Sequence, residues 1–191
     1  MSKVESSLGF LLMSRFSALI LPLYTAAVRD EVDDLLEAWG RERADLDLAP
    51  VAVFSRVSRL ARRLELTRRD AFAAHGIEQW EFDVLAALRR AGTPYQLSPG
   101  RLLRETLVTS GTMTNRIDRL SARGYVERYP DPDDRRGVIV RLTAEGRSAV
   151  DAAFSALLDA ERALLEGLPE GERARLASLL RTLLAPFGST A

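Results

Sequence analysis

The stretch from Thr109 to Leu142 constrains the fold most, because an apolar stripe and a turn-rich segment follow each other within 34 residues. Met113, Ile117 and Leu120 are four and three residues apart, so they fall on one side of an α-helix. This spacing predicts a short amphipathic helix whose apolar side packs on a core. The polar residues between them are left on the outer side.

A β-hairpin is predicted directly after this helix. Gly124 suits the left-handed residue that ends many helices, and Tyr125 to Tyr129 then alternates with the two-residue period of a strand. Val138 to Leu142 is predicted to be the return strand. Residues 130–134 between them are prolines and aspartates, which favour turns, so the following residues should lie at an exposed tip.

The polar positions of this helix and hairpin suit a DNA duplex. Threonine, asparagine and arginine side chains can contact base edges and phosphates, and arginines at a hairpin tip can enter a narrow minor groove. The candidate DNA contacts are Ser110, Thr112, Thr114, Asn115, Arg116 and Arg119 on the helix, with Arg135 and Arg136 at the tip. A solvated helix face and a charged turn are the alternatives for each piece alone, whereas both pieces in this order favour DNA binding.

The composition limits what such a chain can do. Its 191 residues allow one sizeable domain or a small domain with helical extensions, and the absence of cysteine excludes disulfides and thiolate metal sites. The formal net charge is +0, so DNA binding would need a local basic patch. Residues 101–147 hold ten arginines against seven acidic residues, which is only a modest excess.

No set of residues typical of an active site can be assembled. His75 is the only histidine and stands beside Gly76 at a predicted helix end, which favours a cap or surface role over catalysis or metal binding. Asp33 and Asp34 fall on a solvated helix face, and the aspartates of 131–134 fall in a turn. No phosphate-binding glycine loop is present. We expect no enzyme activity, no metal and no cofactor.

An apolar leader from Leu8 to Val28 could just cross a bilayer by its length. Arg15 and Pro22 interrupt it, and Lys3 is the only positive residue ahead of it, which argues against a membrane span or export signal. We therefore expect a cytoplasmic protein without a membrane anchor. Two alternatives stay open for the leader: a helix that packs on a partner subunit, or sequence upstream of the native start.

Helical periodicity continues on both sides of the central stretch. The predicted helices are residues 30–43, 51–74, 78–90, 101–105, 143–167 and a last one that starts at residue 169. The apolar side of the helix at 78–90 is formed by Trp80, Val84, Leu85 and Leu88. Ser98 with Pro99 and Thr143 are suitable starting residues for two of them. The two C-terminal helices carry more apolar surface than a small domain can cover, so we expect them to pair in a homodimer.

The central stretch resembles the MarR family of winged-helix transcriptional regulators. The resemblance rests on Ser110, Thr112, Asn115, Arg116, Arg119, Leu120, Arg123, Gly124, Asp134, Arg135, Arg136, Leu142, Thr143 and Gly146, and extends more weakly over residues 31–186. It implies a mainly α fold with a small β-wing, in which a winged helix-turn-helix is joined to terminal helices. The expected division is 1–29 as the leader, 30–49 as an extra N-terminal helix and linker, 50–75 with 143–187 as a helical dimerisation lobe, and 76–142 as the DNA-binding lobe.

Within that family the chain is most similar to the urate-responsive branch. The resemblance implies that Trp39 and Arg128 contact an anionic purine, and that Asp83 pairs with Arg116 so that ligand charge disturbs the recognition helix. Plain alternatives are a core tryptophan, a structural ion pair and a phosphate-binding arginine. Ala44 departs from the proline common in that branch, which weakens the match.

The function expected from this resemblance is a homodimeric repressor of a pseudo-palindromic DNA operator, released by a small anionic effector such as urate. In such a dimer two recognition helices would enter major grooves about 34–36 Å apart. A winged-helix module that binds protein instead of DNA is the alternative.

Overall fold

The computed structural model describes residues 29–106, 108–132, 134 and 137–187. The predictions for the leader up to residue 28 and for Arg135 and Arg136 lie outside the described residues. The chain divides into two compact units, one that ends at Arg59 and one that begins at Leu60. The division into a leader, an N-terminal helix with linker, a dimerisation lobe and a DNA-binding lobe stays a prediction.

The first unit contains α2 (Glu31–Glu42) and the beginning of α3 (Ala49–Ala73). The N-cap residue of α2, Asp30, also binds a side chain of α3. The Asp30 carboxylate accepts two backbone N–H bonds of the first turn of α2, at 2.9 and 3.1 Å. Arg56 on α3 donates to the same carboxylate at 2.8 and 2.9 Å, and this bond lowers the pKa of Asp30 to about 2. The helix predicted at 30–43 is therefore confirmed, with Asp30 as its cap.

The start of α3 differs from the prediction by two residues. The helix begins at Ala49 rather than Val51, because the Asp47 carboxylate accepts a hydrogen bond from the Ala49 N–H at 2.9 Å. Pro50 then lies in the first turn, where the missing N–H of proline leaves no partner unsatisfied. Pro50, one residue ahead of the helix predicted at 51–74, is thus part of the helix.

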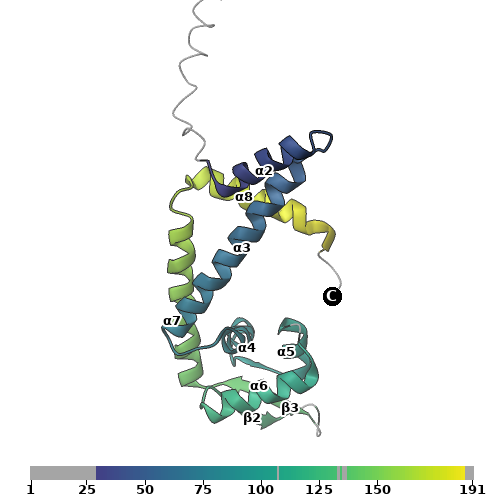
Figure 1. Ribbon diagram of the computed structural model, residues 1–191. Helices are drawn as coiled ribbons and strands as arrows, with labels where there is room; N and C mark the ends of the chain where they lie inside the picture. The colour runs from purple at the N-terminus through teal and green to yellow at the C-terminus, as the bar shows by residue number, and fades with distance from the viewer. Residues whose placement is uncertain (1–28, 107, 133, 135–136, 188–191) are drawn as a thin grey trace, which may run out of the picture. The chain divides into compact units, whose positions relative to one another are not determined.

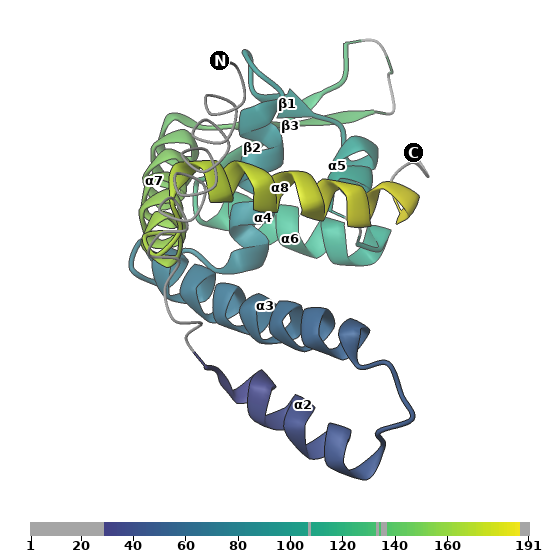
Figure 2. The same ribbon diagram turned by 90° about the horizontal axis from the view of Figure 1, so that it is seen from above.

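The second unit contains the rest of α3, a helix-turn-helix and two longer helices. Its described helices are α4 (Gln79–Arg90), α5 (Pro99–Thr106), α6 (Ser110–Ala122), α7 (Ala144–Leu164), α8 (Glu170–Leu184) and the 3-10 helix η1 (Ala185–Phe187). α4 packs against α5, α6 and α7, and α5 packs against α6, as Figure 1 shows and Figure 2 shows from above. α5 and α6 form the predicted helix-turn-helix.

The predicted hairpin follows α6, and a third strand that precedes α5 extends it to a three-stranded antiparallel sheet. Its strands are β1 (Gln96–Leu97), β2 (Val126–Pro130) and β3 (Val138–Leu142), in the order β1-β3-β2. β2 starts one residue later than predicted, because the Tyr125 N–H still bonds the Leu120 carbonyl at the end of α6. The backbone angle φ of Gly124 is 72°, so this residue adopts the left-handed conformation predicted for it.

The core of the second unit gathers one apolar side from each surrounding element. Met113, Ile117 and Leu120 of α6 are buried as predicted, against Val84, Leu85 and Leu88 of α4. Trp80, predicted on the apolar side of α4, is only half-buried, whereas the carboxylate of Glu81 on the same helix is 1% exposed. A buried acid was not expected from the sequence.

The C-terminal helices keep much apolar surface exposed. Thr143 begins α7 as predicted, since its hydroxyl oxygen accepts the Gly146 N–H at 2.9 Å. Val150 and Leu157 of α7 face the core, but Phe154 and Leu158 are exposed, and α8 has no buried residue. No described helix is long and apolar enough to span a membrane.

Candidate nucleic-acid interface and adjoining pocket

The outer side of α6 carries most of the predicted DNA contacts. Ser110, Thr112, Thr114, Asn115 and Arg119 are exposed and Arg116 is half-buried. The buried stripe on the opposite side fixes which way the helix faces. Thr112, Asn115, Arg116 and Arg119 line one hollow of this surface, and the contact of all six side chains with DNA stays a prediction.

The hairpin of β2 and β3 forms the wing next to α6. Its closing turn is held by a hydrogen bond from the Asp131 N–H to the Gly137 carbonyl at 3.0 Å. Arg141 on β3 lies over the Tyr129 ring of β2 at 4.6 Å and donates two hydrogen bonds to Gln96 of β1. These contacts give the wing a defined base, beyond which Arg135 and Arg136 follow outside the described residues.

Trp80 of α4 stacks with two arginines of α6. The guanidinium carbons of Arg119 and Arg116 lie 4.5 and 5.6 Å from the indole ring. The indole N–H donates to Glu78 at 2.8 Å, and Glu78 also accepts a hydrogen bond from Arg119 at 2.9 Å. Sequence reasoning missed this cluster, because periodicity assigned Trp80 to the apolar side of its helix.

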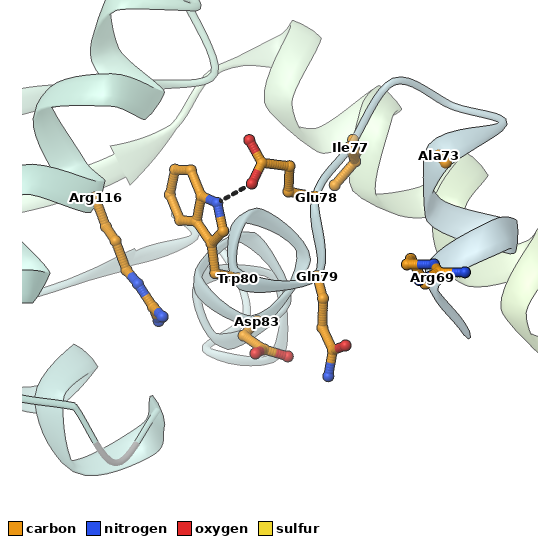
Figure 3. A pocket seen from close by; sticks show the side chains of 8 residues that line it. All are labelled: Arg69, Ala73, Ile77, Glu78, Gln79, Trp80, Asp83 and Arg116. Carbon is orange, nitrogen blue, oxygen red and sulfur yellow. Dashed lines mark hydrogen bonds between the residues drawn. The ribbon is translucent and has the colours of Figure 1, made fainter. Parts of the chain in front are cut away.

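A pocket of about 550 Å³ adjoins this cluster (Figure 3). It is lined by Arg69, Ala73, Ile77, Glu78, Gln79, Trp80, Asp83 and Arg116. Asp83 and Arg116, predicted to act together, thus meet at one pocket. Arg128 lies elsewhere: it lines a separate hollow with Glu127 and Tyr129, and its guanidinium bonds the Asp118 carboxylate at 2.5 Å.

Asp83 has an unusual electrostatic environment. Desolvation by the surrounding protein raises its pKa above the ordinary value, although Arg116, Arg68 and Arg90 act in the opposite direction. Among the contacts of the described residues there is no salt bridge between Asp83 and Arg116. The direct ion pair implied by the resemblance is therefore absent in this structure, and the two groups interact only through space.

Trp39, the other predicted ligand contact, belongs to the first unit. Its side chain is 49% exposed, so the alternative of a core tryptophan is wrong for the described structure. An exposed aromatic plane is free to stack on a ligand, but ligand contact by Trp39 stays a prediction.

A buried ion pair locks the end of α6 to the start of α4. Arg123 is the C-cap residue of α6. Its guanidinium donates to the Glu81 carboxylate at 2.6 Å and to the Gly76 carbonyl at 2.8 Å. The same guanidinium lies 4.6 Å from the Tyr125 ring. Glu81 also accepts the Glu78 N–H at 2.9 Å, so its charge is compensated on two sides. This arrangement sets the orientation of α6.

Neither catalysis nor metal binding is indicated by the described side chains. His75 is exposed, and no group of three or more histidine, aspartate or glutamate side chains in the described ranges could hold a metal ion.

Comparison with known proteins identifies the family. A sequence profile described as the MarR family matches residues 75–137. The HTH-type transcriptional regulator PecS of Dickeya dadantii is 35% identical over 150 residues, which cover 78% of this chain and 90% of PecS. The chain belongs to the MarR family. Its MarR-family relatives are transcriptional regulators rather than enzymes, in agreement with the sequence-based expectation.

Other MarR-family comparisons agree in sequence and in fold. The transcriptional repressor NicR of Pseudomonas putida is 32% identical over 145 residues, covering 74% of this chain and 90% of NicR. A mutant MarR from E. coli, solved in complex with operator DNA, is 25% identical with a TM-score of 0.58 and covers 82% of this chain and 99% of its own. The winged helix-turn-helix fold is thereby confirmed for this MarR-family chain.

Proposed function

We propose that this protein is a homodimeric repressor that binds a pseudo-palindromic DNA operator and is released by a small anionic ligand such as urate or a related purine. The main support is the outer side of α6, where Thr112, Asn115 and Arg119 are exposed while the opposite stripe is buried. A helix held in this way can enter the major groove. The solved complex of the E. coli relative with operator DNA supports the same use.

Exposed apolar side chains on the C-terminal helices support the homodimer. They are Phe154, Leu158 and Leu164 on α7, its C-cap residue Leu165, Leu179, Leu180, Leu183 and Leu184 on α8, and Phe187 on η1. Soluble monomers rarely leave so many large apolar side chains in water, so a second copy of the chain is the natural cover. Two DNA-binding lobes would then contact two half-sites, and a stable monomer in sedimentation would contradict this.

Alanine at Asn115 should weaken operator binding by roughly fivefold to 150-fold, because a lost base contact costs about 1–3 kcal/mol. The measurement is the dissociation constant for duplex fragments selected from genomic DNA by the wild-type protein. Arg175→Ala on α8 is the matched surface control and should bind as wild type. Arg136→Ala should weaken binding and also reduce its salt dependence.

Absence of wild-type binding to any duplex at low salt would contradict DNA recognition and favour the protein-docking alternative. Binding that survives both Asn115→Ala and Arg136→Ala unchanged would contradict the assigned contacts.

The pocket beside Asp83 and Arg116 is the proposed anion site of the second unit. Arg116 offers a cation for an anionic purine edge, and Trp80 offers an aromatic plane at the same pocket. A bound anion would compete with the Asp83 carboxylate for Arg116. The same carboxylate would repel the anion. Since Arg116 is part of α6, ligand binding is coupled to the position of the DNA-contacting side chains. Ligand contact by Trp39 of the first unit, and by Arg128 at its separate hollow, stays a prediction from the resemblance.

Replacing Asp83 with asparagine should tighten urate binding by roughly twofold to fivefold, because the neutral side chain no longer repels the anion. Urate should then release DNA less effectively, since that repulsion is the proposed source of coupling. Because the pKa of Asp83 is raised, its carboxylate becomes protonated at a higher pH than an ordinary aspartate. Lowering the pH should therefore mimic the effect of the substitution on this carboxylate.

Urate titrations with and without bound duplex measure both effects, with Asp159→Asn on α7 as the exposed acidic control. Trp39 fluorescence, compared with Trp39→Phe, reports the separate contact. Equal urate affinity in the presence and absence of DNA would contradict the coupling.

A further inference from the structure

Trp80 of α4 lies at the edge of the core rather than inside it. α4 is already anchored by Val84, Leu85 and Leu88, each 0% exposed, while Trp80 is only half-buried. The indole packs against the edge of the core and also lies against the arginine side chains of α6. The role of a large aromatic residue at such a position depends on the groups that its ring contacts.

The ring faces two of the predicted DNA contacts at once. Arg119 and Arg116 both lie within the range of a favourable cation–π contact, at 4.5 and 5.6 Å. The Glu78 carboxylate accepts one hydrogen bond from the indole N–H of Trp80 and another from Arg119. The ring, the carboxylate and the two guanidinium groups therefore form one ordered cluster.

Order of this kind matters for DNA binding because a free arginine side chain loses much rotamer entropy when it is fixed on a base or phosphate. A guanidinium that is already stacked has lost part of that freedom before DNA arrives. The contacts are exposed enough to be rearranged, since the side chains of Arg119 and Glu78 are 54% and 60% exposed. Stacking engages the face of each guanidinium and not its edge, although one edge donor of Arg119 is already bonded to Glu78.

Trp80 also separates two hollows of the surface. One is the pocket beside Asp83, and the other lies against the outer side of α6 next to Thr112 and Asn115. Trp80 and Arg116 line both of them. In Figure 3 the indole stands between Arg116 and Glu78, with Asp83 below it on the same helix.

We propose that Trp80 is a positioning residue for DNA recognition, which orders Arg116 and Arg119 for contact with the duplex and links the Asp83 pocket to the outer side of α6. This inference rests on the proposed DNA-binding role of α6. It assigns a role to a residue of α4, outside the recognition helix and the wing.

The test is a double-mutant cycle of Trp80→Leu and Arg119→Ala, measured on the duplex fragments selected by the wild-type protein. Trp80→Leu alone should weaken binding by about fivefold to thirtyfold, the fold-change that corresponds to the loss of cation–π stacking. Trp80→Phe keeps an aromatic face but loses the N–H to Glu78, so its binding should be intermediate. In the Arg119→Ala background the effect of Trp80→Leu should fall at least twofold, because one of its two targets is gone.

A residue that served only for stability would give another pattern. Trp80→Leu would then lower the melting temperature, and its effect on DNA binding would be the same with and without Arg119, as additive substitutions are. That additivity, or binding of Trp80→Leu as tight as wild type, overturns the inference. If the wild type binds duplex and Asn115→Ala weakens it while Trp80→Leu does not, only the role of Trp80 fails. If the wild type binds no duplex, the proposed function itself fails.

Discussion

Replacing Gly146 with alanine should destabilise the second unit by about 3 kcal/mol or more, at or beyond the upper end of what overpacking costs. A Cβ at this position would lie 2.0 Å from the Tyr125 carbonyl oxygen and 2.9 Å from its carbon. Both are backbone atoms, so no side chain can rotate away. The first turn of α7 would have to separate from the chain that enters β2.

Neighbouring hydrogen bonds prevent that separation at low cost. Thr143 donates its N–H to the Tyr125 carbonyl at 3.1 Å and its hydroxyl to the Gly124 carbonyl at 2.7 Å. Moving α7 together with Thr143 to make room for a methyl group would break both bonds, and moving it without Thr143 would break the cap bond to the Gly146 N–H.

Gly171→Ala is the matched control, because Gly171 also lies in the first turn of a helix but has open space around its Cβ position. It should be neutral or slightly stabilising, as alanine is favoured over glycine in helices. Urea unfolding followed by circular dichroism measures both variants. Equal stability of Gly146→Ala and wild type would show that the close approach at Tyr125 does not exist in solution.

Replacing Arg123 with alanine should cost about 3 kcal/mol of unfolding free energy, the lower end of the range for breaking a buried ion pair. The lower end applies because Arg123 is 38% exposed while Glu81 is 1% exposed. Without the guanidinium, a buried carboxylate keeps only one backbone N–H partner, from Glu78. The Gly76 carbonyl loses its donor as well.

The double variant Glu81→Gln with Arg123→Ala should recover part of this loss, because a neutral amide is less costly to bury than a lone charge. Arg162→Ala on α7, whose ion pair with Asp159 is exposed, should change stability by less than about 1 kcal/mol. Operator binding should weaken in Arg123→Ala beyond the loss of folded protein, since α6 is released from α4. If the double variant were no more stable than Arg123→Ala, an uncompensated charge would not be the cause.

Local patterns were sufficient for the elements that carry the DNA-binding layout. The stripe of Met113, Ile117 and Leu120 predicted the buried side of α6 and therefore its outer side, since helical periodicity relates the two. Thr143 and Gly124 act through their own backbone geometry, so their roles as helix start and helix end were also predictable.

Features that depend on distant partners were not predictable in the same way. β1 has only two residues, too few for a strand pattern, and exists because it pairs with β3 more than forty positions away, as in Gln96 with Arg141. Trp80 and Glu81 follow each other in the chain, yet the charged residue is buried and the aromatic one is half-exposed. Arg123 and the arginines of α6 decide this, because they supply a charge partner for Glu81 and cations for the indole.

The sequence by itself therefore determined the helices, the wing strands and the outward side of α6, since each follows from the periodicity and capping of neighbouring residues. Only the tertiary structure decided which charged groups meet: Asp83 and Arg116 at one pocket, Arg128 with Asp118, and Glu78 with Trp80 and Arg119. Electrostatic and cation–π contacts act over a few ångströms between residues far apart in the chain, and the packing of α4 on α6 sets those distances.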